Sequence, residues 1–128
     1  MGVLHILLQK CTNLANKDTI GIGKSDPYVR FELEQDNTFR DKDYGKKCSS
    51  KKKDELNPEY NEEFTFSDIP TLHNMVLKVV VMDDDIAFDD KVGKCKIKLD
   101  KIGFTSGVPY EGSWVSLSLI LEKLLLYF

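Results

Sequence analysis

Apolar residues alternate with polar ones along much of this chain, and this period of two restricts its fold most. The ranges 28–33 and 94–99 are the clearest cases, because in each an apolar residue follows a polar, aromatic or charged one three times in succession. Successive side chains of a strand point to opposite faces, so each range predicts a strand with one buried face. The ranges 4–8, 64–66 and 77–81 predict further strands of the same kind.

Turn-rich stretches separate these ranges, at 16–26, 57–58, 67–70, 83–93 and 103–112. No convincing amphipathic helix interrupts them, so about seven or eight short strands predict an all-β antiparallel sandwich. The last ten residues suit a buried strand or a helix by composition, and we expect a closing strand because an all-β core needs its last layer. At 128 residues the chain has room for one core, so we expect a single domain over 1–128.

The charges are segregated although the net charge is only −3. Five of the eight residues at 46–53 are lysine, and five of the eight at 83–90 are aspartate. Such blocks are usually solvated faces. A binding role for either block therefore needs support from another part of the chain.

Several classes of protein are disfavoured by what the sequence lacks. Three cysteines without a CxxC pair argue against a disulfide framework and a structural zinc site, and they fit a reducing compartment. There is no signal peptide and no apolar run long enough to span a bilayer, so we expect a cytoplasmic protein that meets membranes peripherally. We expect no enzyme activity, because no nucleophile elbow or phosphate-cradling glycine loop is present and both histidines are isolated. Nothing resembles a base-stacking platform or a reading helix, so we expect no nucleic-acid partner.

Aspartates crowd the stretch that follows the strand expected at 77–81. Asp83 and Asp85 are two residues apart, so at a strand end they project to the same side. Asp89 and Asp90 follow as the chain turns toward the next strand. Carboxylates this close repel one another unless a cation lies among them, and Ca²⁺ takes six to eight such oxygens. The stretch indicates a calcium site, with a solubilising acidic turn as the alternative.

A second loop carries aspartates in a matching arrangement. Asp18 stands at its start, and Asp26 stands just before the strand expected at 28–33. Pro27 fixes the entry to that strand without removing a needed ladder hydrogen bond. Two acidic loops together favour calcium over a solubilising turn.

Three motifs occur in a fixed order. They are Ser-Asp-Pro-Tyr-Val at 25–29, Leu-Asn-Pro-Glu-Tyr-Asn-Glu-Glu-Phe-Thr-Phe at 56–66, and Asp-x-Asp followed by Asp-Asp-x-Val-Gly within 83–93. Together they closely resemble the C2 domain of conventional protein kinases C and synaptotagmins, over essentially the whole chain. The opening strand, with an eighth strand after Trp114, looks like the second (type II) of the family's two circularly permuted topologies. The resemblance implies an eight-stranded antiparallel Greek-key β-sandwich with two or three Ca²⁺ ions in loops at one end.

The resemblance also implies which residues bind the metal. The loop between Asp18 and Asp26 is longer than the family pattern, and the loop that contains Asp85 is shorter, so Asp84 and Asp89 are additional candidates. The five ligand positions of the family fall here on Asp18, Asp26, Asp83, Asp85 and Asp90.

Apolar side chains stand at the tips of both acidic loops, where they are costly to leave in water. Beside a calcium site they make sense as groups that enter the headgroup region of a membrane. Phe88 is the leading candidate, since its full burial would contribute about 1.5–3 kcal/mol. The membrane-inserting candidates are Ile20, Ile22, Ile86 and Phe88.

The lysine block precedes the expected turn at 57–58, on a strand that often carries a basic patch in C2 domains. Near anionic or phosphoinositide headgroups each lysine is worth about 1 kcal/mol. On a strand the block would divide between two faces, so about half of it would meet one membrane. Lys47, Lys51 and Lys53 would share one side, and Lys46 and Lys52 the other.

We therefore expect Ca²⁺-dependent binding to anionic phospholipid membranes, with phosphatidylserine or a phosphoinositide as the lipid. The alternative is a calcium-independent C2 domain that binds protein partners, or phosphoinositides through its lysine-rich strand.

Overall fold

Eight strands and one short 3-10 helix make up the regular structure in the part of the chain that is described. The computed structural model describes residues 2–12, 26–53, 55–84, 90–104, 110–116 and 119–128, with the backbone alone at 90, 111–116, 119–125 and 127. The strands are β1 (Gly2–Thr12), β2 (Pro27–Gln35), β3 (Lys42–Cys48), β4 (Glu59–Ile69), β5 (Met75–Asp83), β6 (Asp90–Lys98), β7 (Tyr110–Ser116) and β8 (Leu119–Tyr127), and the helix η1 is Leu99–Lys101.

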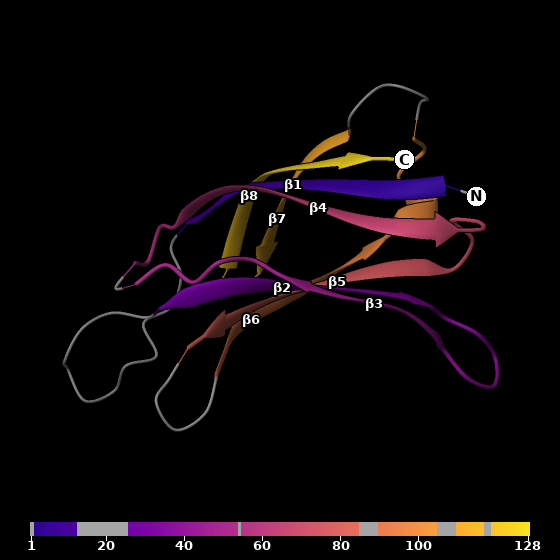
Figure 1. Cartoon of the computed structure of the whole chain (residues 1–128), viewed down its shortest axis with the longest axis horizontal. Coiled ribbons are helices and arrows are strands. Elements are labelled where there is room, and N and C mark those ends of the chain that lie inside the picture. The colour runs from indigo at the N-terminus through magenta and orange to yellow at the C-terminus, as the bar shows by residue number, and fades with distance from the viewer. Residues whose placement is uncertain (1, 13–25, 54, 85–89, 105–109, 117–118) are drawn as a thin grey trace.

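The strands form two four-stranded antiparallel sheets packed face to face. The first sheet has the order β4-β1-β8-β7 and the second has the order β3-β2-β5-β6. They are the upper and lower layers of Figure 1. The last strand of the chain lies between β1 and β7. The predicted all-β sandwich and its closing strand are confirmed.

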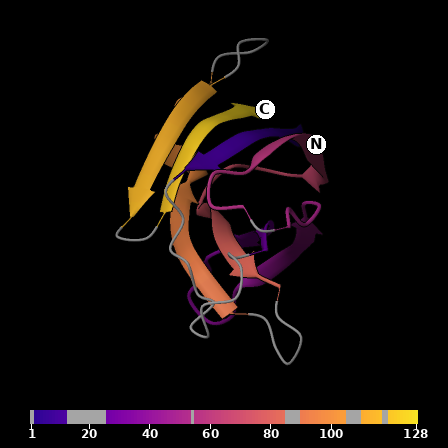
Figure 2. The same cartoon turned by 90° about the vertical axis from the view of Figure 1, so that its left-hand side faces the viewer.

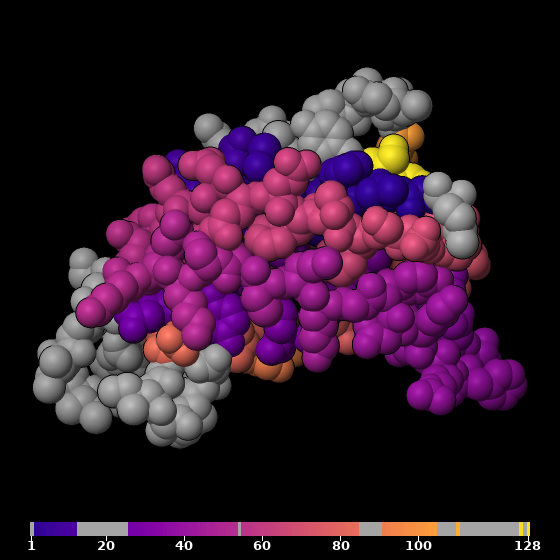
Figure 3. Space-filling view, in the orientation of Figure 1, coloured from indigo at the N-terminus to yellow at the C-terminus, as the bar shows by residue number. Residues whose placement is uncertain are grey.

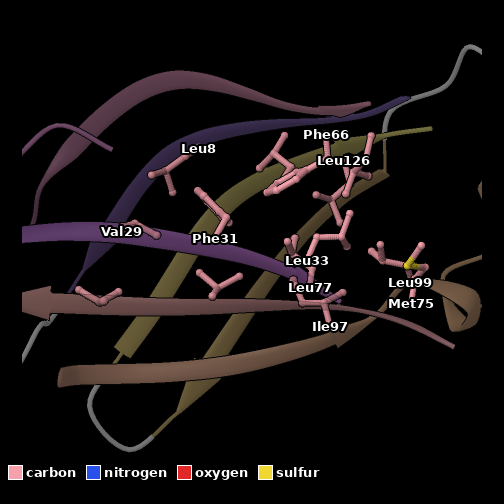
Figure 4. Close-up of a cluster of buried hydrophobic side chains, with 14 of the residues drawn as sticks. Leu8, Val29, Phe31, Leu33, Phe66, Met75, Leu77, Ile97, Leu99 and Leu126 are labelled. Carbon is pink, nitrogen blue, oxygen red and sulfur yellow. The ribbon is translucent and has the colours of Figure 1, made fainter. Parts of the chain in front are cut away.

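The alternating apolar residues fill the space between the sheets. Val29, Phe31 and Leu33 on β2 are fully buried, and Leu77 on β5 packs with them. Figure 4 shows these side chains pointing toward those of the other sheet. The centre of the Phe31 ring lies 5.1 Å from the centre of the Phe64 ring on β4, so this pair joins the two layers.

Strand β4 is longer than the sequence predicts, since 67–69 was expected to be part of a turn. Ile69 is fully buried and pairs with Gly2 of β1. Asp68 has a φ of 60°, and the register with β1 shifts beside it. This β-bulge absorbs the turn-like residues while the strand continues to the buried isoleucine.

The lysine block is only partly on a strand, which corrects the expected alternation. Lys46 and Lys47 belong to β3, but the strand ends at Cys48. The hydroxyl of Ser49 accepts a hydrogen bond of 2.8 Å from the N–H of Val29, where a continuing strand would offer a carbonyl. Lys51, Lys52 and Lys53 therefore lie in the connection to β4, and strand alternation does not assign their directions.

The described ranges contain no helix that is long and apolar enough to cross a membrane.

Candidate functional site

Three strand ends meet at one end of the second sheet. β2 begins there, β5 ends there and β6 begins there, at the left of Figure 1 and toward the viewer in Figure 2. The register pairs Pro27 with Asp83, and Asp83 with Asp90. Neighbouring strands lie about 4.8 Å apart. Asp26, Asp83 and Asp90 come from three separate parts of the sequence, and the register brings their backbones into one short row across the strand ends.

Backbone and side-chain hydrogen bonds hold this row together. The N–H of Asp26 donates to Oδ1 of Asp83 at 2.8 Å. The N–H of Asp84 donates to the carbonyl of Asp26 at 3.1 Å. The start of β2 and the end of β5 are thus fixed to each other by the aspartates themselves.

Asp83 is 1% exposed, which is unusual for a carboxylate. Taking an anionic group out of water costs several kcal/mol unless hydrogen bonds or opposite charges compensate for the loss of hydration. The Asp26 N–H supplies one such bond, while the neighbouring carboxylates of Asp26 and Asp84 add negative charge. Carboxylate and carbonyl oxygens are the ligands that Ca²⁺ prefers, so the donor set fits this ion.

A basic segment, Ser49–Lys53, lies beside the aspartates. The N–H of Lys52 donates to the carbonyl of Pro27 at 3.0 Å, which fixes the segment against the start of β2. Nζ of Lys51 then lies 3.1 Å from Oδ1 of Asp84 and 5.5 Å from the centre of the Tyr28 ring. A cation of the chain itself therefore partly neutralises the acidic end.

Tyr60 of β4 fixes the same strand end from the other sheet. Its hydroxyl donates to the carbonyl of Pro27 at 2.9 Å. Burial raises the pKa of the Tyr60 hydroxyl, so it keeps its proton and remains a donor. Nζ of Lys52 lies 5.7 Å from the centre of the Tyr60 ring.

The predicted site residues divide into three groups by what the structure describes. It brings together Asp26, Asp83 and Asp84, and it places the backbone of Asp90 beside them. All five lysines are described: Lys46 and Lys47 lie on β3, Lys51 and the backbone of Lys52 contact the acidic end, and Lys53 follows in the connection to β4. Outside the described residues lie Asp18, Asp85 and Asp89, and the apolar candidates Ile20, Ile22, Ile86 and Phe88.

A second acidic group, not singled out from the sequence, lies at the opposite end of β2. Among the described residues, carboxylate oxygens of Glu34, Asp36 and Asp41 come within 4.8 Å of one another. The group stands where the β2–β3 connection projects from the body of the molecule (Figure 3). Glu34 is 2.7 Å from Nζ of Lys78, and Asp41 accepts the N–H of Asn37 at 3.1 Å. Lysine and the backbone already engage two of the three carboxylates.

Comparison with protein families and known sequences gives consistent matches. A family model described as "C2 domain" matches residues 2–116. Synaptotagmin-3 of Arabidopsis thaliana is 36% identical over 103 residues, which cover 80% of this chain and 17% of that protein. Synaptotagmin-1 of Caenorhabditis elegans is 35% identical over 105 residues, covering 80% and 22%. The chain thus spans about a fifth of the length of these relatives.

Solved structures agree with the fold. The first C2 domain of plant Extended Synaptotagmin 1 superposes with a TM-score of 0.76 at 24% identity, covering 98% of this chain and 92% of that one. The tandem C2 domains of Extended-Synaptotagmin 2, in a calcium-bound structure, give a TM-score of 0.71 at 25% identity, covering 98% and 45%.

Proposed function

The chain belongs to the C2 domain family, and on that premise we propose that it binds anionic phospholipid membranes in response to Ca²⁺. The buried Asp83 is the observation that carries this proposal. This carboxylate is 1% exposed and stands in a row with Asp26 and the backbone of Asp90, so it supplies a fixed oxygen of the kind that Ca²⁺ prefers.

The proposed ligand set for two or three Ca²⁺ ions extends beyond the described residues. Asp84 and Asp89 are additional candidates, and Lys51 already pairs with Asp84. Bound calcium would neutralise the acidic end and leave coordination positions for the phosphate of a lipid. The five main ligands are Asp18, Asp26, Asp83, Asp85 and Asp90.

The similar proteins support both the membrane binding and the response to calcium in this proposal. The curated relatives are synaptotagmins, and the structure of Extended-Synaptotagmin 2 is described as calcium bound. We propose phosphatidylserine as the main lipid, a cytoplasmic location with peripheral recruitment, and a binding role without catalysis. Insertion of Ile20, Ile22, Ile86 and Phe88 into the headgroup region would add apolar contacts.

Sedimentation with lipid vesicles tests this function. The chain is expected to pellet with vesicles of phosphatidylcholine and phosphatidylserine when calcium is present, and to remain in the supernatant with EGTA or with an equal concentration of magnesium. Vesicles of phosphatidylcholine alone are the lipid control and should not bind it, because they lack net negative charge.

The same experiment distinguishes the alternative function. Pelleting that ignores calcium but is lost when Lys51, Lys52 and Lys53 become glutamine would replace the proposal with calcium-independent lipid binding through the lysine block. If no anionic vesicle binds the chain under any condition, the domain's partners are proteins and the proposal is wrong.

The Lys51–Asp84 ion pair gives a prediction about calcium affinity. Lys51→Gln removes a positive charge that lies 3.1 Å from Asp84 and leaves the aspartates unchanged. Both side chains are partly exposed, at 55% and 37%, so solvent screens the interaction and a small effect is expected. The dissociation constant for calcium should fall by about two- to fivefold in a calorimetric titration.

Lys53→Gln is the matched control for this change. It removes the same charge from the same segment, and no ion pair joins Lys53 to another described residue. Its calcium affinity should stay within about 1.5-fold of the unchanged protein, since exposed charges farther away are largely screened. Equal gains in both variants would mean that net charge, not the Lys51–Asp84 pair, sets the affinity.

A further inference from the structure

Two apolar features lie at the end of the sandwich opposite the row of aspartates, where β2 and β6 end and β5 begins (Figure 1). One is Phe39 in the β2–β3 connection, whose side chain is 100% exposed. The other is a groove of about 510 Å³ between the β4–β5 connection and the residues that follow β6. Its apolar lining includes Leu72, Leu99, Phe104 and Phe128.

The β2–β3 connection is tied to the wall of this groove. The N–H of Asn37 donates to Oδ1 of Asp41 at 3.1 Å, which closes the connection on itself. At its base the side-chain amide of Gln35 donates to the carbonyl of His73 at 3.0 Å, and His73 is one of the groove's lining residues. Phe39, which stands where the connection projects from the body of the molecule (Figure 3), therefore has a set position relative to the groove.

Phe39 does not fill the groove of its own chain. A side chain that is 100% exposed contacts none of the apolar groups that line it. The aromatic rings of the groove also stay partly in water, since Phe104 is half-buried and Phe128 is 38% exposed, with their ring centres 6.2 Å apart. One molecule thus leaves apolar surface in water on both features, although each has the size and chemistry to cover the other.

The charges beside the two features are opposite. Arg40 follows Phe39 and is exposed, and no ion pair joins it to another described residue. Asp100, an exposed residue of the groove lining, accepts the N–H of Asn74 through Oδ2 at 3.1 Å, which holds its carboxylate in place. A ring that enters the groove with an arginine behind it would bring the guanidinium toward this carboxylate, and such charge-assisted pairs favour one orientation.

We propose that the groove receives Phe39 of a second copy of this chain, with the arginine of that copy beside Asp100, in a reciprocal dimer. Because the connection and the groove lie at the same end of the molecule, a twofold axis between two copies places each Phe39 at the other copy's groove. The contact then closes after two molecules and does not propagate into a filament.

The expected dimer is weak. An aromatic side chain buries about 150–250 Å², so two such anchors and their grooves give an interface at the small end of the range, where complexes are transient. A dissociation constant on the order of 100 µM is therefore expected.

The dimer has a consequence that rests on the proposed function. The copies meet end to end, so the two rows of aspartates lie at opposite extremes of the pair. With calcium, one dimer would bind two anionic membranes and hold them together. Formation of the dimer itself needs neither calcium nor lipid.

Sedimentation equilibrium in EGTA without lipid tests the dimer apart from the calcium site. Phe39→Ala should raise its dissociation constant by more than about 30-fold, because both anchors are lost and one such anchor is commonly worth that factor. Thr38→Ala changes the exposed neighbour of Phe39 in the same connection and should stay within about twofold of the unchanged protein. A chain that remains monomeric up to about 1 mM, or a Phe39→Ala variant that still dimerises, would overturn the proposal.

Mixing two variants shows whether Phe39 meets the groove. Leu72→Lys leaves Phe39 intact but replaces a half-buried apolar group of the groove with a cation that repels Arg40. Isotope-labelled Phe39→Ala, whose groove is intact, should show amide shifts at Gly103 and Phe104 when unlabelled Leu72→Lys is added. Unlabelled Phe39→Ala should cause none. Equal responses to both would mean that the contact lies elsewhere and would overturn the proposal.

Vesicles separate this proposal from the proposed function. With calcium and phosphatidylserine vesicles, Phe39→Ala should pellet as fully as the unchanged protein but should no longer cluster the vesicles in light scattering. A dimer in EGTA without pelleting in calcium would support the dimer and overturn only the proposed function. If the chain is monomeric and Phe39→Ala loses vesicle binding, the side chain is a membrane anchor and the dimer proposal is wrong.

Discussion

Calcium is expected to raise the melting temperature of this protein, and replacing Asp83 with asparagine is expected to abolish that rise. At a free calcium concentration 100 times the dissociation constant, binding to the folded state adds about 2.7 kcal/mol of stability. For a domain of this size that corresponds to a shift of roughly 10 °C. Asp83 is the most buried of the described candidate ligands, and its loss removes both charge and a fixed oxygen from the centre of the row.

The substitution separates metal binding from folding. Asparagine keeps a side-chain oxygen that can accept the N–H of Asp26, now 2.8 Å from Oδ1 of Asp83. It also replaces a buried anion with a neutral amide, which costs less to bury. Without calcium, the melting temperature of Asp83→Asn should therefore equal or exceed that of the unchanged protein.

Asp68→Asn on β4 is the control, because Asp68 is exposed and its φ of 60° suits asparagine equally well. It should keep the full calcium shift, which differential scanning fluorimetry would record beside a magnesium series. If Asp83→Asn still shows the full shift, Asp83 is not a ligand and its burial has another cause.

The sequence predicts most of the sandwich because its strands obey a single rule. In β2 and β6 the side chains that alternate in the sequence also alternate between core and solvent. The prediction is wrong where one side chain or a local backbone conformation decides. The hydroxyl of Ser49 ends β3 before the last three lysines, and a positive φ at Asp68 lets β4 run on to Ile69. The alternation of apolar and polar residues in the sequence predicts neither the end of β3 nor the extension of β4.

The sequence predicts which residues belong to the candidate site but not the contacts between them. Motif order indicates that Asp26, Asp83 and Asp90 belong together, and the register agrees for the strand ends. The Lys51–Asp84 pair needs a connection folded back against β2, which no spacing rule provides.

Replacing Phe31 with alanine is expected to lower the free energy of unfolding by about 3–5 kcal/mol. Phe31 is fully buried and is among the largest side chains of the core. It extends from the second sheet toward the first, where its ring lies 5.1 Å from that of Phe64 at an interplanar angle of 47°. The substitution would therefore leave a cavity between the layers, which β-sheets on both sides can close only by moving as units.

Phe39→Ala makes the same chemical change in the β2–β3 connection, where the side chain is 100% exposed. It should alter stability by less than about 0.5 kcal/mol, since no packed contact is lost. Urea denaturation of both variants measures the difference, and similar slopes would show that the unfolded states are comparable. A loss below about 1.5 kcal/mol in Phe31→Ala would mean that the sheets can close over the cavity. The interface between them would then be less rigid than the burial of Phe31 implies, and the row of aspartates at the start of β2 would have a correspondingly mobile support.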